Sequence, residues 1–166
     1  MYNIGDKVVY GAFGVMEIVD ITTEMFGDIS KKYYVLKEYS SKSTSLTYVP
    51  LDNEALVEQL KPLLTREEII EVIKASKVAE PLEWIEDNRA RSEFYKKLLG
   101  TSDRLKLLCM IDAVYKTGIR RESEGKKNYI ADENSMHKAE KLISIEFSLV
   151  LGIPETEVFD FISNVK

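Results

Sequence analysis

The sequence predicts an α+β protein of two domains, a small antiparallel β barrel followed by an all-α domain of four to five helices. Two observations lead to this fold class. The first 50 residues alternate in strand fashion, and from residue 51 onward the apolar side chains recur with the period of helices. This change of period places the N-terminal domain over residues 1–52 and the helical domain over residues 53–166.

Four short segments rich in β-branched and aromatic residues are the expected strands. Glycine and serine turns separate them, and Pro50 ends the last one because proline has no N–H to donate to a ladder. Four or five short antiparallel strands in about 50 residues suggest a small SH3-like or Tudor-like barrel. The expected strands cover residues 6–10, 15–21, 32–37 and 45–49.

The helices of the second domain are predicted from their caps and glycine stops. Thr65 and Glu68 have the spacing of a capping box, which opens a helix that reaches about Lys77. A polar stretch over residues 120–128 is expected to be a loop. The other expected helices run over about 84–99, 103–116, 133–151 and 154–165.

The composition is typical of a globular protein, with 45% hydrophobic and 31% charged residues in a chain of 166. Charges interrupt the longest apolar stretches, which fall short of the about 18 residues that a membrane span needs. The N-terminus has neither the basic nor the apolar region of a secretory signal. The lone cysteine, Cys109, fits a reducing compartment. We expect a cytoplasmic monomer without membrane contact.

The formal net charge of −5 argues against a protein that coats nucleic acid through bulk electrostatics. The charge is unevenly distributed, however. Residues 84–127 carry 11 Lys/Arg against 7 Asp/Glu, a net charge of +4 inside an acidic chain. This basic segment is either the solvated side of ordinary helices or a surface for an acidic partner.

No residue pattern indicates catalysis, a metal or a cofactor. His137 lies in an expected helix with no cysteine near enough to help it bind a metal. Cys109 lies in an apolar run with no neighbouring base that would lower the pKa of its thiol. The segment 11–14 precedes a strand and lacks the Lys-Ser/Thr of a phosphate loop. We therefore expect a binding protein and not an enzyme.

Trp84 is the only tryptophan, and it stands where the basic segment opens. It either staples the entering chain to the core or acts as an apolar wedge for a partner or an unstacked base step. In the helix expected after it, basic residues fall opposite an apolar stripe or beside it. The candidate DNA-binding residues are Trp84, Arg89, Arg91, Lys96, Arg104 and Lys106.

The whole chain resembles the CarD/CdnL family of bacterial transcription regulators. The resemblance lies in the order and spacing of short segments along the chain. They are residues 4–10, Gly14 followed by 15–20, residues 33–37, Val49-Pro50, Trp84 and residues 151–155.

The resemblance implies two contacts. A Tudor-like N-terminal domain, shared with the transcription-repair coupling factor, would bind the β subunit of RNA polymerase by strand pairing. A helical domain would contact promoter DNA at the upstream edge of the transcription bubble. Trp84 would then be a wedge in the minor groove that stabilises the open complex, and Arg89 a basic DNA contact. The residues implied at the polymerase are Glu24, Thr47, Tyr48, Val49 and Pro50.

The chain departs from the family at several of these positions. Glu24 and Tyr48 stand where the family often has arginines facing the polymerase, and Glu86-Asp87 stands where basic residues are common. Fewer phosphate contacts predict weaker DNA binding that depends on the polymerase. The alternative is an adaptor that binds the polymerase without productive DNA contact.

Overall fold

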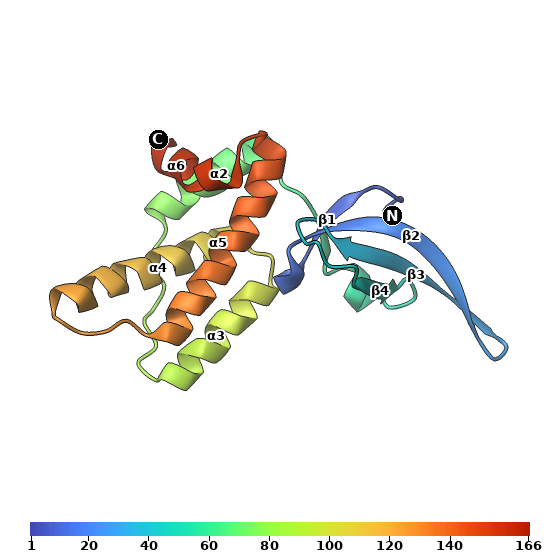
Figure 1. Ribbon diagram of the computed structural model, residues 1–166, viewed down its shortest axis with the longest axis horizontal. Helices are drawn as coiled ribbons and strands as arrows, with labels where there is room; N and C mark the ends of the chain where they lie inside the picture. The colour runs from blue at the N-terminus through green and yellow to red at the C-terminus, as the bar shows by residue number, and fades with distance from the viewer. The chain divides into compact units, whose positions relative to one another are not determined.

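The computed structural model describes residues 1–166 and divides them into two compact units, Met1–Leu63 and Leu64–Lys166 (Figure 1). The first unit extends beyond the boundary expected at residue 52. The reason is a short strand, β5 (Leu60–Pro62), which pairs antiparallel with the first strand of the sheet. Residues 60–62, which the sequence placed in the helical domain, therefore form the last strand of the sheet.

The first unit is a five-stranded antiparallel sheet in the order β4-β3-β2-β1-β5. The strands β4 and β5 are its two edges and do not pair with each other, so the sheet is not the closed barrel that the sequence predicted. Closure requires the edge strands to pair along a staggered register, and β5 has only three residues. The other strands are β1 (Lys7–Tyr10), β2 (Val15–Phe26), β3 (Ile29–Glu38) and β4 (Leu46–Pro50).

Strands β2 and β3 form a hairpin much longer than the sequence predicted, and Figure 1 shows it extending past β4. A two-residue turn joins them, and Gly27 takes a positive φ of 64° there. A bulge between Ile18 and Asp20 shifts the register and turns the strand. The core of this unit lies under the other half of the sheet, at Val8, Met16, Ile18, Tyr34, Leu36, Val49 and Leu60.

The second unit contains five α-helices, which confirms the predicted all-α domain. The longest helix, α5, packs against both α3 and α4 (Figure 1). No helix is both long enough and apolar enough to cross a bilayer. The helices are α2 (Arg66–Val78), α3 (Asn88–Gly100), α4 (Arg104–Ser123), α5 (Ile130–Leu151) and α6 (Val158–Asn164), with α1 (Glu54–Val57) in the first unit and short 3-10 turns η1 (Gly11–Phe13) and η2 (Glu155–Glu157).

Four predicted helix starts or ends were wrong, among them α5, which begins at Ile130 and not at 133, and α6, which begins at Val158 and not at Pro154. The helix expected from residue 84 begins at Asn88, because the Asp87 carboxylate accepts the Ala90 N–H and caps the helix there. The next helix continues through Gly118 to Ser123, so part of the expected 120–128 loop is helical. Gly118 lies against Asn128, where a Cβ would be 3.2 Å from Nδ2, so this glycine permits close packing and does not end the helix.

Candidate functional site

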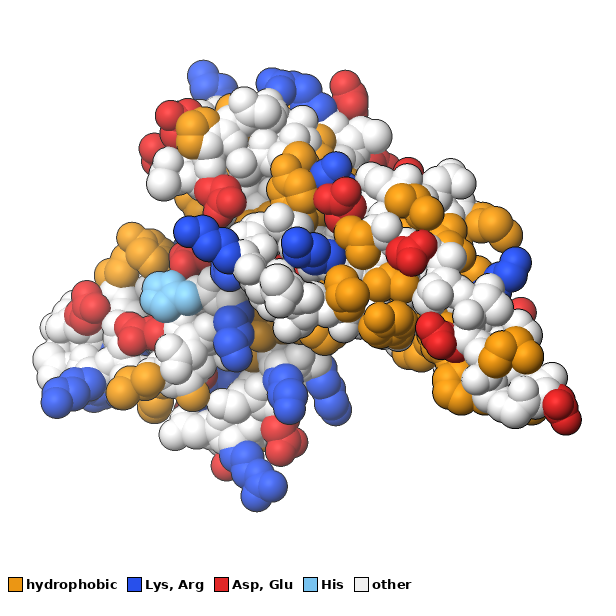
Figure 2. Space-filling view, turned by 45° about the vertical axis from the view of Figure 1, so that its right-hand side comes forward, with side chains coloured by type: hydrophobic (Ala, Val, Ile, Leu, Met, Phe, Trp, Pro, Cys, Tyr) orange, Lys and Arg blue, Asp and Glu red, His pale blue; other side chains and the backbone are white.

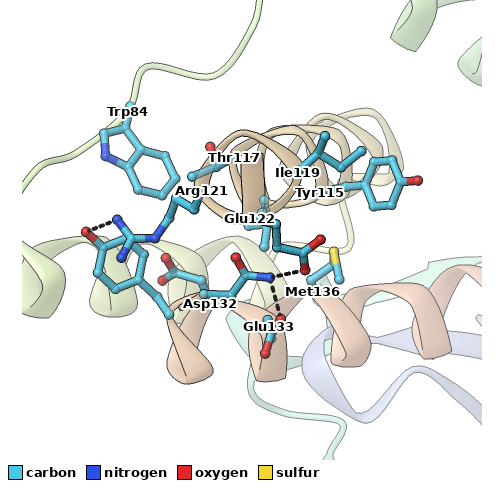
Figure 3. Close-up of a pocket in the computed structure, with 13 residues that line it drawn as sticks. Trp84, Tyr115, Thr117, Ile119, Arg121, Glu122, Asp132, Glu133 and Met136 are labelled. Carbon is cyan, nitrogen blue, oxygen red and sulfur yellow. Dashed lines mark hydrogen bonds between the residues drawn. The ribbon is translucent and has the colours of Figure 1, made fainter. Parts of the chain in front are cut away.

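Trp84 lies in the segment between α2 and α3, outside any helix or strand, and its side chain is partly buried. Figure 3 shows its indole ring above the end of α4, beside Arg121. The ring centroid lies 6.3 Å from that of Tyr129, which precedes α5. The staple and the wedge are therefore compatible, because the ring contacts the helical unit and still keeps exposed surface.

Arg91 of α3 lies under this tryptophan. Its guanidinium carbon is 4.2 Å from the centre of the Trp84 ring and 4.6 Å from that of Tyr129, within the range of cation–π contacts. Its Nε donates to Asp132 of α5 at 2.9 Å, and its Nη1 and Nη2 donate to the Ile85 carbonyl at 2.7 Å and the Asn88 Oδ1 at 2.8 Å. Arg91 is only 1% exposed. It is not accessible to DNA, which corrects its assignment as a DNA contact.

Two titratable groups around Arg91 respond to their burial. Burial raises the pKa of the Asp132 carboxyl, and the Arg91 guanidinium opposes that rise. Burial, followed by the negative charge of Asp132, raises the pKa of Tyr95 to about 12, while Arg91 acts in the opposite direction. A buried ion pair thus lies beneath the partly buried Trp84 ring, and a neutral tyrosine lies close to that pair.

The end of α4 and the turn after it are ordered around Tyr129. The Arg121 guanidinium lies 4.0 Å from the Tyr129 ring centre and donates to its hydroxyl at 3.1 Å. Its Nε also donates to the Lys127 carbonyl at 2.9 Å. These contacts fix the second half of the stretch that the sequence predicted as a loop.

Two hollows border Trp84. The first, of about 280 Å³, runs between α4 and α5 past Tyr129, Asn128 and Met136 (Figure 3). The second, of about 250 Å³, is polar and is lined by Arg120, Arg121, Lys126 and the acidic Glu86 and Glu124. Three basic side chains from residues 120–126 therefore lie on one side of the tryptophan, an arrangement that depends on the unexpected length of α4.

The remaining basic candidates divide into exposed and buried ones. Arg89, Lys96 and Lys106 are exposed on α3 and α4, and Arg89 forms only an exposed pair with Glu93 at 3.5 Å. Arg104 is instead bound to the buried Glu146, with Nε and Nη2 at 2.9 and 2.8 Å from its two carboxylate oxygens. The structure thus corrects the assignment of Arg104, whose charge is used inside the fold.

Strand β4 carries the residues implied at the polymerase. The Leu51 N–H donates to the Lys32 carbonyl of the neighbouring chain segment. In an antiparallel ladder every second residue directs its N–H and C=O toward the same neighbour. The backbone groups of Val49 and Thr47 therefore face β3, and those of Tyr48 face the open edge. The Tyr48 side chain is 52% exposed and Val49 is buried. Pro50 has no N–H and ends the accessible edge.

Glu24 does not share this edge. It lies on β2 opposite Lys31, and β3 separates it from β4. Figure 2 shows hydrophobic side chains gathered on the face of the sheet unit that it presents. The large hydrophobic residues exposed in this unit include Phe13, Met25, Phe26, Ile29, Leu46 and Tyr48.

Sequence reasoning missed Tyr129 and Asp132 as neighbours of Trp84, because they come from another segment of the chain and no local pattern joins them to it. The burial of Arg91 did have a signal. It shares the i, i+4, i+7 spacing with the buried Tyr95 and Leu98, so it lies on the inner face of α3.

The family comparison assigns the first unit. Residues 2–61 match the model of the family described as CarD-like/TRCF RID domain. The chain is therefore a transcription-related protein that interacts with RNA polymerase. Its N-terminal unit belongs to the CarD-like/TRCF RID family, which confirms the resemblance over these residues. The comparison with curated proteins gave no match.

Proposed function

We propose that the chain docks on the β subunit of RNA polymerase through the β4 edge and contacts promoter DNA at the upstream edge of the bubble through Trp84, stabilising the open complex. The observation that carries the proposal is the pairing of a polymerase-interacting sheet unit with a partly exposed tryptophan among basic side chains. The protein would act in the cytoplasm, with the polymerase.

Docking is supported by the backbone of β4. An edge strand offers N–H and C=O groups that a partner strand can satisfy, and Tyr48 presents both toward the open edge. Its ring lies 6.3 Å from that of Tyr33 in an edge-to-face arrangement. Hydrophobic contacts here would replace the arginine contacts that the family uses.

DNA contact is supported by the surroundings of Trp84. Its ring has a polar hollow beside it, to which Arg120 contributes positive charge for phosphates and Lys126 a second charge that is paired with Glu124 at 2.8 Å. Glu86 and Glu124 line the same hollow and reduce its net charge. The chain as a whole has a net charge of −5. Binding to DNA alone should therefore be weak, and docking on the polymerase would supply the local concentration.

The regulatory effect follows from differential affinity. A protein that binds the open complex more tightly than the closed complex shifts the population by the ratio of those affinities. Trp84 can supply the difference, because an apolar wedge needs an unstacked base step that the closed duplex does not provide.

The test compares Trp84→Ala with Tyr48→Pro in an assay of open-complex lifetime at a promoter where the parent protein extends it. Tyr48→Pro removes the outward N–H without removing a bond to β3, so it should weaken polymerase binding, whereas Tyr48→Val should keep it. Trp84→Ala should retain binding to the polymerase and lose the longer lifetime. A lifetime unchanged by Trp84→Ala contradicts the wedge.

The second candidate is an adaptor on the polymerase without productive DNA contact. The acidic Glu86 beside Trp84 and the net charge of −5 favour it. Footprinting of the polymerase at a promoter, with and without the protein, separates the two functions. The wedge predicts new protection upstream of the bubble, and the adaptor predicts none. Neither candidate assigns chemistry to His137 or Cys109, and we propose no enzymatic activity.

A further inference from the structure

We propose that Arg91 is a positioning residue that holds the Trp84 ring in one orientation, so that the ring meets its partner already ordered. The inference deepens the proposed promoter contact and rests on it for its functional meaning. Its physical content, that Arg91 immobilises Trp84, concerns the free protein.

The segment that carries Trp84 has no secondary structure of its own. Residues 79–87 connect α2 to α3 without helix or strand, so no ladder of backbone hydrogen bonds fixes the tryptophan. Besides the ring of Tyr129, the groups that hold it come from Arg91. Nη1 binds the Ile85 carbonyl, Nη2 binds the Asn88 side chain, and the guanidinium lies against the indole. One side chain of α3 thus holds both the ring and the backbone that follows it.

Arginine suits this task for geometric reasons. Its planar guanidinium presents five N–H donors in a fixed fork and can contact an aromatic face at the same time. At Arg91 the donors reach Asp132, Ile85 and Asn88, while the guanidinium carbon lies 4.2 and 4.6 Å from the ring centres of Trp84 and Tyr129. A lysine has one nitrogen and no plane, so it could pair with Asp132 but could not keep all these contacts.

Stability alone does not require this arrangement. A buried ion pair can often be replaced by two apolar side chains of similar volume without loss of stability. The pair of Arg91 and Asp132, 1% and 3% exposed, is of this kind. What an apolar pair would not reproduce is the set of bonds to Ile85 and Asn88 and the cation–π contact with Trp84. Those contacts act on the segment that carries the ring.

The experiment uses the single tryptophan as its own probe, because all tryptophan fluorescence of the chain reports on Trp84. The contacts of Arg91 with Trp84, Ile85 and Asn88 are called the clamp below. The parent is compared with the clamp variant Arg91→Met/Asp132→Leu, which removes these contacts without leaving a buried unpaired charge. The matched control is Arg89→Met/Glu93→Leu, which removes the exposed pair from the same helix. Acrylamide quenching and time-resolved anisotropy are measured at full length, with circular dichroism as the check of folding.

In the folded clamp variant the Trp84 ring loses its cation–π contact with Arg91. We therefore expect acrylamide quenching of Trp84 to rise by about twofold or more. We also expect fast local motion of the ring to appear in the anisotropy decay. The control pair should leave both signals at the parent value. A folded clamp variant with parent-like quenching and anisotropy overturns the proposal.

If the double variant does not fold, Arg91→Lys decides. It keeps a positive charge for Asp132 but lacks the fork, so a folded Arg91→Lys protein should show the same loosening of Trp84. If that variant also unfolds, the parent protein alone decides. Its Trp84 must rotate only with the whole helical unit, and rapid independent motion of the ring overturns the proposal.

Open-complex lifetime then connects the clamp to function. We expect the clamp variant to bind the polymerase like the parent and to extend the lifetime less, by a factor that follows the increase in quenching. The two proposals fail separately. The promoter function is rejected if the parent protein holds Trp84 rigidly and Trp84→Ala nevertheless leaves the open-complex lifetime unchanged. The role of Arg91 is rejected if Trp84 stays rigid in the folded clamp variant.

Discussion

Arg104 and Glu146 form a doubly hydrogen-bonded ion pair inside the helical unit, with the two Arg104 nitrogens 2.9 and 2.8 Å from the two carboxylate oxygens. The Glu146 Oε1 also accepts the Leu64 N–H at 3.0 Å. This carboxylate therefore joins α4, α5 and the first residue of the unit. An arginine that opens a helix in a basic segment is here used for internal architecture.

Breaking this pair should destabilise the protein more than removing an exposed basic residue does. Arg104→Met leaves Glu146 buried without its partner, which costs about 3 kcal/mol or more. Lys106→Met on the same helix should change the free energy of unfolding by less than about 0.5 kcal/mol. Urea unfolding measures both. Equal effects of the two substitutions would show that Arg104 is not structural.

Asp87 should contribute to the stability of α3 through its capping bond with the Ala90 N–H, which is 2.7 Å long. We expect Asp87→Ala to cost about 1 kcal/mol and Asp87→Asn to cost less, because asparagine also caps. Glu86→Ala, which removes an exposed carboxylate next to it, serves as the control and should be nearly neutral. The free energy of unfolding in urea is the measurement, and an equal effect of Asp87→Asn and Asp87→Ala would contradict the capping role.

Tyr95 should make the protein less stable at high pH. Its pKa rises from 10.0 to about 12 in the folded state, so the folded protein keeps a proton that the unfolded chain releases. Its contribution is complete below pH 10 and disappears as the pH rises toward 12, at up to about 1.4 kcal/mol per pH unit. Tyr95→Phe should reduce this dependence. The measurement is the difference in unfolding free energy between about pH 9.5 and about pH 11, which lie on either side of the ordinary tyrosine pKa. An identical difference in the parent protein and in Tyr95→Phe would contradict the prediction.

The sequence predicted the fold class because the period of its apolar residues changes once, and that signal is local. It predicted the capping box at Thr65 and Glu68, which is present with both bonds, at 3.2 and 2.7 Å. It did not predict that the sheet stays open, because pairing between edge strands depends on residues far apart in the chain. The strand β5 was missed because three residues carry no recognisable period.

At the candidate site the sequence identified Trp84 but not its partners. Arg89 and Arg91 are two residues apart and have the same type of side chain, yet one is exposed and the other buried. Their helical positions distinguish them, because Arg91 shares the i, i+4, i+7 spacing with the buried Tyr95 and Leu98 and Arg89 does not. The contacts of Arg91 with Asp132 and Tyr129 join residues of different segments, and only the packing of α3 on α5 brings them together.

The basic residues beside Trp84 should determine the salt dependence of DNA binding. Arg120 and Lys126 are exposed and line the polar hollow next to the ring, whereas Lys74 lies exposed on α2 and does not line it. Removal of one phosphate contact should lower the slope of log affinity against log salt by about 0.9.

We expect Arg120→Ala and Lys126→Ala to reduce the slope for binding to a polymerase–promoter complex, and Lys74→Ala to leave it unchanged. The slope for polymerase without DNA should be the same in all three variants, because the sheet unit is untouched. Parent-like slopes for both Arg120→Ala and Lys126→Ala at the promoter would assign the phosphate contacts to Arg89, Lys96 and Lys106 instead.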